Sequence, residues 1–281
     1  MKVSIIGSGT MGIGIAQVLI QSEDVVKLNI IARTVEKAEF VKAACLKCLS
    51  KMVRKGKISE SFASSTIEKL TINDSLTGIQ SSDLVIEAVA EDFDIKLDLY
   101  KKLVPYITED MIIASNTSSL SITAFANLFP KPENVVGLHF FNPAPVMELV
   151  EIVSGHVSSE PVIQKLKDFT TKLGKSPVVV NEAPGFVVNR MLIPMINEAV
   201  SILAEGVATA EDIDKAMKFG AHHPMGPLAL ADLIGNDVNL SIMETLYKET
   251  GDPKYRAHPM LRKMVRANHL GRKTKKGFFN Y

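Results

Sequence analysis

Two titratable side chains, His139 and Glu151, lie in neighbouring segments whose residue types predict β-strands. His139 belongs to the apolar run 135–141 and Glu151 to the β-prone run 146–153, with Asn142-Pro143-Ala144-Pro145 between them. If the runs pair as a hairpin, the carboxylate lies beside the imidazole and fixes which ring nitrogen carries the proton. The residues therefore predict a proton-transfer pair at the end of a sheet. The alternative is a buried histidine bonded to a backbone carbonyl and a glutamate on an exposed strand face.

Two earlier apolar runs, residues 84–89 and 111–114, predict buried parallel strands, and a polar loop follows each of them. Glu91 lies in the first loop and Ser118 in the second. Ligands of parallel sheets bind at the carboxyl ends of the strands. Because His139 also stands near the end of a predicted strand, we expect these side chains to face one site.

A glycine-rich segment, Gly7-Ser8-Gly9-Thr10-Met11-Gly12, connects the first predicted strand to the first predicted helix. Here Gly7 allows a tight turn, Gly9 lets a pyrophosphate approach the backbone, and Gly12 lets helix and strand pack closely. The N–H groups at the start of the helix supply donors for the phosphates. The segment predicts a dinucleotide-binding fold, with Thr10 and Met11 in the cofactor site.

The end of the second predicted strand, residues 26–31, bears on the choice of dinucleotide. Ala32-Arg33-Thr34 follows this strand, and no acid occurs before Glu36. An acid at this point binds the ribose hydroxyls of NAD, whereas an arginine suits the 2′-phosphate of NADP. The sequence therefore predicts an NAD(P)(H) cofactor, with NADP(H) favoured through Arg33. The alternative is a solvated Arg33, with Glu36 or a backbone group at the ribose.

The chain has 281 residues, a net charge of +1, and no apolar run near the ~18 residues of a membrane span. We therefore expect no nucleic-acid partner and no membrane partner. The N-terminus enters a strand after Lys2 without the features of a signal peptide, so we expect a cytoplasmic protein. Cys45 and Cys48 lie within the predicted helix 35–54, where we expect small helix residues and not a redox pair.

The last third of the chain predicts helices. A strand at 177–180 and a junction at 181–185 precede a largely apolar helix expected over about residues 186–205. Asn189, near the start of that helix, is expected to face a cleft between domains. The fold class is therefore α/β: a Rossmann-type, doubly wound, mostly parallel sheet over residues 1–183, followed by an all-α domain over residues 184–281.

The helical domain also predicts a partner. Its apolar helix surface exceeds what a domain of this size is expected to bury, so we predict a homodimer through residues 186–281. Thr209 with Asp212 forms a capping pattern at the start of a further helix. His222 and His223 follow that helix without cysteine or carboxylate ligands nearby, so we predict a structural loop and no metal site.

Six motifs occur in one order along the whole chain: Gly7–Gly12, Ser115–Leu120, His139–Pro143, Pro184–Arg190, His223–Pro227, and Gly271–Thr274 followed by Gly277-Phe278. With them the chain resembles the L-3-hydroxyacyl-CoA dehydrogenases. It is most similar to the short bacterial form of clostridial butyrate and butanol metabolism, which acts on 3-hydroxybutyryl-CoA and acetoacetyl-CoA.

The resemblance implies a role for each matching residue. His139 matches the catalytic base and Glu151 the carboxylate that orients it. Ser118 and Asn189 match the residues that hold the substrate's oxygen and acyl group. Residues that match the cofactor site are Glu91, Lys96, Ser118, Asn142 and Lys273. Lys55, in the basic run that begins at Lys51, matches a lysine that binds coenzyme A. The alternative for the basic run is a solvated helix end. Two departures are that the family's strand-end aspartate falls on Ala32 or Arg33, and that a serine near coenzyme A is replaced by Cys48.

The implied reaction is reversible hydride transfer between NAD(P)(H) and a 3-hydroxybutyryl-CoA/acetoacetyl-CoA pair. Histidine suits this reaction because its ordinary pKa lies near neutrality, so it both accepts and donates a proton. One alternative is a dehydrogenase of the same build for longer 3-hydroxyacyl-CoA or another 3-hydroxy acid. The other is a non-catalytic dinucleotide-binding protein, which the intact His139, Glu151, Ser118 and Asn189 disfavour. The basic stretch 262–276 is expected to be a solvated tail that closes on phosphates.

Overall fold

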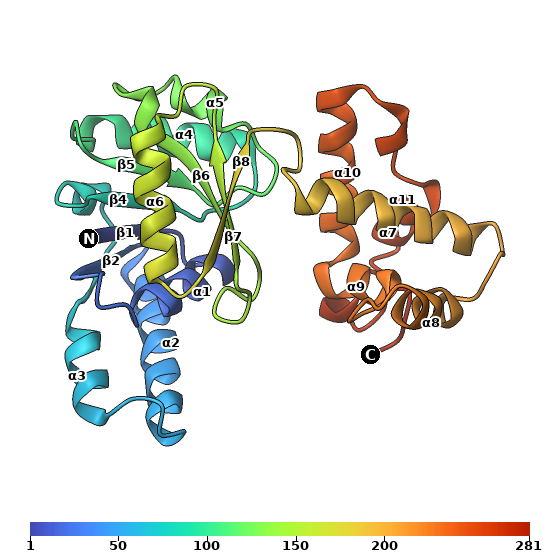
Figure 1. Ribbon diagram of the computed structural model, residues 1–281, viewed down its shortest axis with the longest axis horizontal. Coiled ribbons are helices and arrows are strands. Elements are labelled where there is room, and N and C mark those ends of the chain that lie inside the picture. The colour runs from blue at the N-terminus through green and yellow to red at the C-terminus, as the bar shows by residue number, and fades with distance from the viewer. The chain divides into compact units, whose positions relative to one another are not determined.

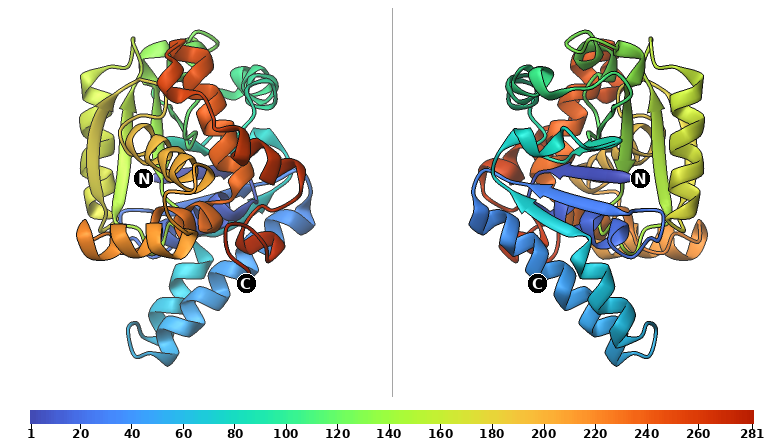
Figure 2. Two further views of the ribbon diagram at one scale, coloured as in Figure 1. Left: turned by 90° about the vertical axis from the view of Figure 1, so that its right-hand side faces the viewer. Right: turned by 90° about the vertical axis from the view of Figure 1, so that its left-hand side faces the viewer.

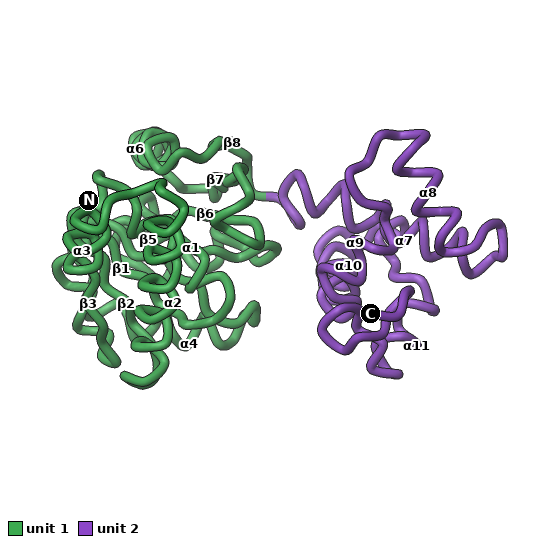
Figure 3. The backbone as a smooth tube through the Cα atoms, turned by 90° about the horizontal axis from the view of Figure 1, so that it is seen from below, with its two compact units in different colours: residues 1–182 green, residues 183–281 purple.

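The computed structural model describes all 281 residues. The chain forms two compact units, residues 1–182 and 183–281 (Figures 1 and 3). The division falls one residue before the boundary expected from the sequence. Each unit has its own elements and its own apolar core.

The first unit contains one eight-stranded sheet with the strand order β3-β2-β1-β4-β5-β6-β7-β8. Strands β1 to β6 are parallel, β7 runs antiparallel to β6, and β8 is parallel to β7. The predicted doubly wound, mostly parallel sheet is thereby confirmed. The strand order reverses between β1 and β4, which is where such sheets bind ligands. The strands are β1 Lys2–Ile6, β2 Lys27–Ile31, β3 Leu70–Asn73, β4 Leu84–Glu87, β5 Ile112–Ser115, β6 Val135–Phe140, β7 Leu149–Ser154 and β8 Ser176–Asn181.

Both faces of the central strands are covered, because every residue of β4, β5 and β6 is buried. One core cluster joins the sheet to α1, α2 and α6 through residues such as Ile15, Ala38 and Leu166. A second group is aromatic: the Tyr100 ring lies 5.0 Å from that of Phe125. The helices of this unit are α1 Thr10–Leu19, α2 Val35–Arg54, α3 Glu60–Glu68, α4 Phe93–Leu103, α5 Ile122–Ala126 and α6 Glu160–Lys172, with short 3-10 turns at Leu76–Ile79, Val104–Tyr106 and Pro132–Asn134.

Helices α2 and α3 form a pair that projects from the sheet (Figure 2). The predicted helix over residues 35–54 is confirmed. Thr34 caps α2 by accepting the N–H of Lys37, and buried apolar residues then recur at helical spacing along one face. The other face is mostly polar, with Phe40 and Leu46 also exposed, and its end presents the exposed basic residues Lys51, Arg54 and Lys55 to solvent.

The second unit is helical, as the sequence predicts. Its main helix begins at Val188, two residues later than expected, because Gly185 and Phe186 adopt positive φ angles of 72° and 50°. Thr209 accepts the N–H of Asp212, so the predicted cap is confirmed. The helices are α7 Val188–Ala204, α8 Ala210–Gly220, α9 Pro227–Ile234, α10 Asn236–Thr250 and α11 Pro259–Arg266, with 3-10 turns at Pro253–Tyr255 and Arg272–Thr274.

The basic side chains of the C-terminal stretch 262–276 are exposed, apart from a half-buried Arg262, so the expected solvation is confirmed, but the chain here is folded into α11 and a 3-10 turn, and the residues that follow are anchored on α9. The carboxylate of Asp232 is 1% exposed and accepts the backbone N–H groups of Phe278 and Phe279 at 3.0 and 2.9 Å. A side chain at Gly277 would overlap that carboxylate, with a Cβ only 1.9 Å from its oxygen. The sequence did not predict this anchor, because Asp232 lies on α9, 46 and 47 residues before Phe278 and Phe279.

The cysteines behave as small helix residues. Burial raises the pKa of the Cys45 thiol to about 12, and it also raises the pKa of Cys48. Both thiols are therefore poor nucleophiles near neutral pH.

No group of His, Cys, Asp and Glu side chains in the chain is arranged to hold a metal ion. No helix combines the length and apolar composition needed to cross a membrane.

Candidate active site

The glycine-rich turn after β1 has the geometry of a phosphate-binding turn. Gly7 has a φ of 130°, and a Cβ there would lie 2.3 Å from the carbonyl oxygen of Ala88. A Cβ on Gly12 would lie 2.2 Å from the Gly7 oxygen, whereas one on Gly9 would meet no atom within 4 Å. The turn is thus closed on the protein side and open at Gly9, which caps α1 without a side-chain bond. The open side and the N–H groups of α1 fit a dinucleotide pyrophosphate.

The end of β2 presents Arg33 to solvent beside a buried Ala32. Glu36 lies on the first turn of α2, where a hydrogen bond with Thr34 and one with its own backbone N–H lower the pKa of its carboxyl group. Glu36 is therefore an exposed anion on the first turn of α2, where a negative charge complements the helix dipole.

His139 and Glu151 occupy directly paired positions of the antiparallel strands β6 and β7. Nδ1 of His139 lies 2.8 Å from Oε2 of Glu151, and the two side chains are 7% and 1% exposed. The predicted hairpin pairing is thereby confirmed. An ionised Glu151 only accepts hydrogen bonds, so Nδ1 carries the hydrogen and Nε2 is the nitrogen left to exchange a proton.

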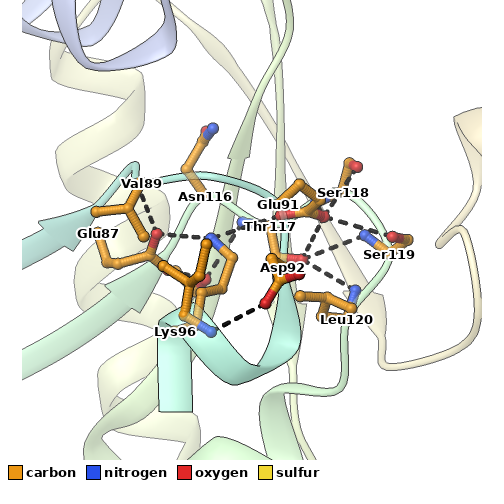
Figure 4. A network of polar contacts seen from close by, with 12 residues as sticks. Glu87, Val89, Glu91, Asp92, Lys96, Asn116, Thr117, Ser118, Ser119 and Leu120 are labelled. Carbon is orange, nitrogen blue, oxygen red and sulfur yellow. Dashed lines mark hydrogen bonds and ion pairs between the residues drawn. The ribbon is translucent and has the colours of Figure 1, made fainter. Parts of the chain in front are cut away.

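The loop after β5 carries Ser118, and Glu91 holds this loop (Figure 4). Oε1 of Glu91 accepts the Thr117 hydroxyl at 2.7 Å, the Ser118 N–H at 2.7 Å and the Ser118 hydroxyl at 3.0 Å. The Ser118 loop also joins the strand that carries His139, because Oδ1 of Asn116 accepts the N–H of Phe140 at 2.9 Å. The loop after β4, which carries Glu91, and the loop after β5, which carries Ser118, are therefore connected by hydrogen bonds at the carboxyl edge of the sheet.

A buried polar cluster lies behind this loop, and the sequence reasoning missed its centre. Glu87, the last residue of β4, is 0% exposed and bonds to Lys96, Tyr100 and Ser115. Lys96, expected at the cofactor, is itself 1% exposed, with its Nζ 2.6 Å from Glu87 and 3.5 Å from Glu91. The signal available in the sequence was Glu87 itself, a charged residue at the end of a strand that is otherwise apolar on both faces.

Asn142 lies in an exposed turn after β6, joined to Pro143 by a cis peptide bond. Lys175 holds this turn by donating to the carbonyls of Ala144 and Met147 at 2.7 and 2.8 Å. Burial lowers the pKa of Lys175, opposed by the charge of Glu148. Because residues 143–147 form this turn, β7 begins at Leu149 and not at residue 146 as expected.

The remaining predicted residues lie elsewhere in the chain. Lys51 and Lys55 are exposed at the end of α2. Asn189 lies on the first turn of α7 and Lys273 in the anchored C-terminal segment, both in the second unit. The ammonium of Lys273 is bound by the carboxylate of Asp237, 2.5 Å away.

Comparison with known proteins agrees with this geometry. Residues 2–183 match the description "3-hydroxyacyl-CoA dehydrogenase, NAD binding domain", and residues 185–281 match "3-hydroxyacyl-CoA dehydrogenase, C-terminal domain". The chain is 50% identical to a 3-hydroxybutyryl-CoA dehydrogenase of Clostridioides difficile, covering 100% of this chain and 99% of that protein. It is 39% identical to the human mitochondrial hydroxyacyl-coenzyme A dehydrogenase, covering 99% and 90% of the two chains.

A solved structure extends the likeness to three dimensions. The crystal structure of (S)-3-hydroxybutyryl-CoA dehydrogenase from Ralstonia eutropha matches with a TM-score of 0.95 and 42% identity, covering 100% of this chain and 98% of that one. Family descriptions, sequence relatives and fold all span the full length of the chain. The chain therefore belongs to the 3-hydroxyacyl-CoA dehydrogenase family.

Proposed function

We propose that the chain catalyses reversible hydride transfer between NAD(P)(H) and the pair (S)-3-hydroxybutyryl-CoA and acetoacetyl-CoA. The observation that carries the proposal is the buried bond between His139 and Glu151 at the carboxyl edge of the sheet. The substrate class is supported by the relatives named 3-hydroxybutyryl-CoA dehydrogenase, at 42–50% identity over the whole chain.

The proton chemistry follows from the hydrogen-bonded pair. When bound, the nicotinamide ring supplies the hydride acceptor or donor. As the hydroxyl carbon is oxidised, Nε2 of His139 takes the hydroxyl proton; in the reverse direction it returns a proton to the ketone oxygen. Glu151 keeps the imidazole in one orientation and stabilises the imidazolium that forms on Nε2 protonation.

Ser118 and Asn189 are proposed to hold the substrate's oxygen and acyl group. A serine hydroxyl both donates and accepts, so it binds the same oxygen in the alcohol and the ketone without a charge penalty. Ser118 is supported by its place beside the strand that bears His139. Asn189 and Lys273 enter the proposal through the family resemblance, as do Glu91, Lys96 and Asn142 at the cofactor.

For the cofactor we propose a preference for NADP(H). The exposed guanidinium of Arg33 at the end of β2 suits a 2′-phosphate, and no acid stands at the end of β2 before Glu36 on the first turn of α2. For coenzyme A we propose Lys51 and Lys55 as phosphate partners at the exposed end of α2.

A homodimer through residues 186–281 stays a prediction. It is supported by exposed apolar side chains such as Met191 and Phe219, which are 73% and 70% exposed.

Oxidation of NADPH and NADH by acetoacetyl-CoA tests the function. The His139→Ala variant should lose about 10²- to 10⁴-fold in kcat, the usual contribution of a general acid–base group. His156→Ala is the matched control, because His156 is an exposed histidine after β7. No turnover of the natural chain with either cofactor would reject the proposal, and turnover only with longer 3-ketoacyl-CoA would favour the longer-chain alternative.

The cofactor preference has its own test. Arg33→Asp should weaken the use of NADPH by about tenfold more than the use of NADH, because it replaces a phosphate donor with a repelling charge. Lys47→Asp makes the same charge change on an exposed face of α2 and should weaken both equally. Equal losses in the Arg33 variant would contradict a contact with the 2′-phosphate.

A further inference from the structure

Glu87 is a fully buried carboxylate whose hydrogen bonds are all directed within the first unit. Its Oε1 accepts the N–H of Val89 at 2.8 Å and the ammonium of Lys96 at 2.6 Å. Its Oε2 accepts the hydroxyls of Tyr100 and Ser115, each at 2.7 Å. A buried charge is costly unless it is paired and hydrogen-bonded, and these donors, one of them cationic, meet that condition.

Two arms lead from Glu87 to the Ser118 loop (Figure 4). In the first arm, the ammonium of Lys96 lies between the carboxylates of Glu87 and Glu91, and Glu91 binds the N–H and hydroxyl of Ser118. In the second arm, the hydroxyl of Ser115 donates to Glu87 and accepts the N–H of Thr117 at 3.3 Å. Both arms end on adjacent residues of the same loop, Thr117 and Ser118.

The hydroxyl of Tyr100 is a lasting donor to Glu87. Burial and the charge of Glu87 raise the pKa of Tyr100 well above its ordinary value, so its hydroxyl stays a donor at neutral pH. A glutamine at position 87 would present an amide N–H₂ group to one pair of these donors. Its neutral side chain would also leave the Lys96 ammonium with Glu91 alone as an anionic partner, and would draw Glu91 toward Lys96.

We propose that Glu87 is a positioning residue for the reaction, which acts by fixing Lys96 and Ser115 so that Glu91 and the 115–119 loop hold Ser118 in place. This inference rests on the proposed function, because it requires Ser118 to contact the substrate. Glu87 itself is 0% exposed and its carboxylate is bonded to Val89, Lys96, Tyr100 and Ser115, so in this proposal it acts through the loop and not on the substrate.

A double-mutant cycle in acetoacetyl-CoA reduction separates positioning from general destabilisation. Glu87→Gln should lower kcat by about 10- to 100-fold, the range for residues that orient a catalytic group, while KM for the cofactor changes by less than about threefold. In a Ser118→Ala background the same substitution should lower kcat by less than about twofold, because the group it positions is already gone. Equal losses in both backgrounds would overturn the proposal.

A second variant covers the outcome in which Glu87→Gln does not fold. Ser115→Ala removes one donor to Glu87 and the acceptor for the Thr117 N–H without touching a charge. It should lower kcat severalfold in the natural background and leave it unchanged in Ser118→Ala. Lys102→Ala breaks the exposed ion pair between Lys102 and Asp98 on α4, the helix that also carries Lys96. It is the control and should leave kcat unchanged in both backgrounds.

Hydrogen exchange tests the positioning itself without turnover. Amides of residues 115–120 should exchange at least about tenfold faster in Glu87→Gln than in the natural chain, with those of β1 unchanged. Unchanged exchange in this loop would overturn the proposal even if the enzyme is active. An inactive natural chain would instead overturn the proposed function, and the role of Glu87 in the reaction with it.

Discussion

The first unit contains two buried glutamates at the same edge of one sheet, and their partners differ in kind. Glu151 is bonded to an imidazole, a group that gains and loses a proton near neutral pH. Glu87 is bonded to an ammonium, two hydroxyls and a backbone N–H, all of which donate to its carboxylate. A carboxylate beside a titrating partner can manage a proton, whereas one among fixed donors can only hold position.

The difference also separates their expected effects. Loss of the charge at Glu151 should appear in the chemical step, because imidazolium formation is part of that step. Loss of the cation beside Glu87 should appear first in the stability of the fold, because a buried charge is left uncompensated. The variants below test that division, from the largest expected effect to the smallest.

Glu151→Gln should lower kcat by about 10²- to 10³-fold with little change in KM, because the imidazolium loses its compensating charge. Steady-state reduction of acetoacetyl-CoA measures both parameters. Glu148→Gln is the control, since Glu148 is an exposed acid just before the same strand and should retain kcat within about twofold. If Glu151→Gln kept the natural kcat, Glu151 would take no part in the chemical step, and both glutamates would serve only to hold the structure.

Lys96→Met should lower the free energy of unfolding by about 3–5 kcal/mol, because Glu87 is then a buried charge without its cation. Urea unfolding followed by circular dichroism measures the change. The exposed pair of Lys102 and Asp98 on the same helix provides the control: Lys102→Met should cost less than about 1 kcal/mol. A loss below 1 kcal/mol for Lys96→Met would mean that Glu87 is not held as a buried anion.

Features built from neighbouring residues were predictable from the sequence. The glycine turn, the helix over residues 35–54 and the pairing of His139 with Glu151 each follow from a local pattern: a motif at a strand end, helical periodicity, or a hairpin whose register places two residues opposite. The beginning of β7 was misplaced by three residues, because a turn held by Lys175 extends through residues that are β-prone in composition.

Features built from distant residues were not predictable. The partners of Glu87 stand 9, 13 and 28 residues away, and those of Asp232 on the C-terminal segment 46 and 47 residues away. Neither acid belongs to a motif, so only the fold reveals that each is satisfied. For Glu87 a charge within a buried strand was a warning that partners must exist, but it could not identify them.

The smallest effect expected is that of Tyr100→Phe, which removes one hydroxyl donor from Glu87 and leaves the ring packed against Phe125. At pH 7 the free energy of unfolding should fall by about 1 kcal/mol. Because the pKa of Tyr100 is raised in the folded protein, the unfolded chain releases this proton first, above pH about 10, and the stability due to the hydroxyl is lost as pH rises further. Phenylalanine does not titrate, so the unfolding free energies of variant and natural chain should converge above pH 10, whereas the exposed Tyr247→Phe control should show no such convergence. If the difference in unfolding free energy between Tyr100→Phe and the natural chain stayed constant from pH 7 to above pH 10, the Tyr100 hydroxyl would not be held by a buried anion. Glu87 would then not be a carboxylate fixed among permanent donors, and the contrast with Glu151 would fail.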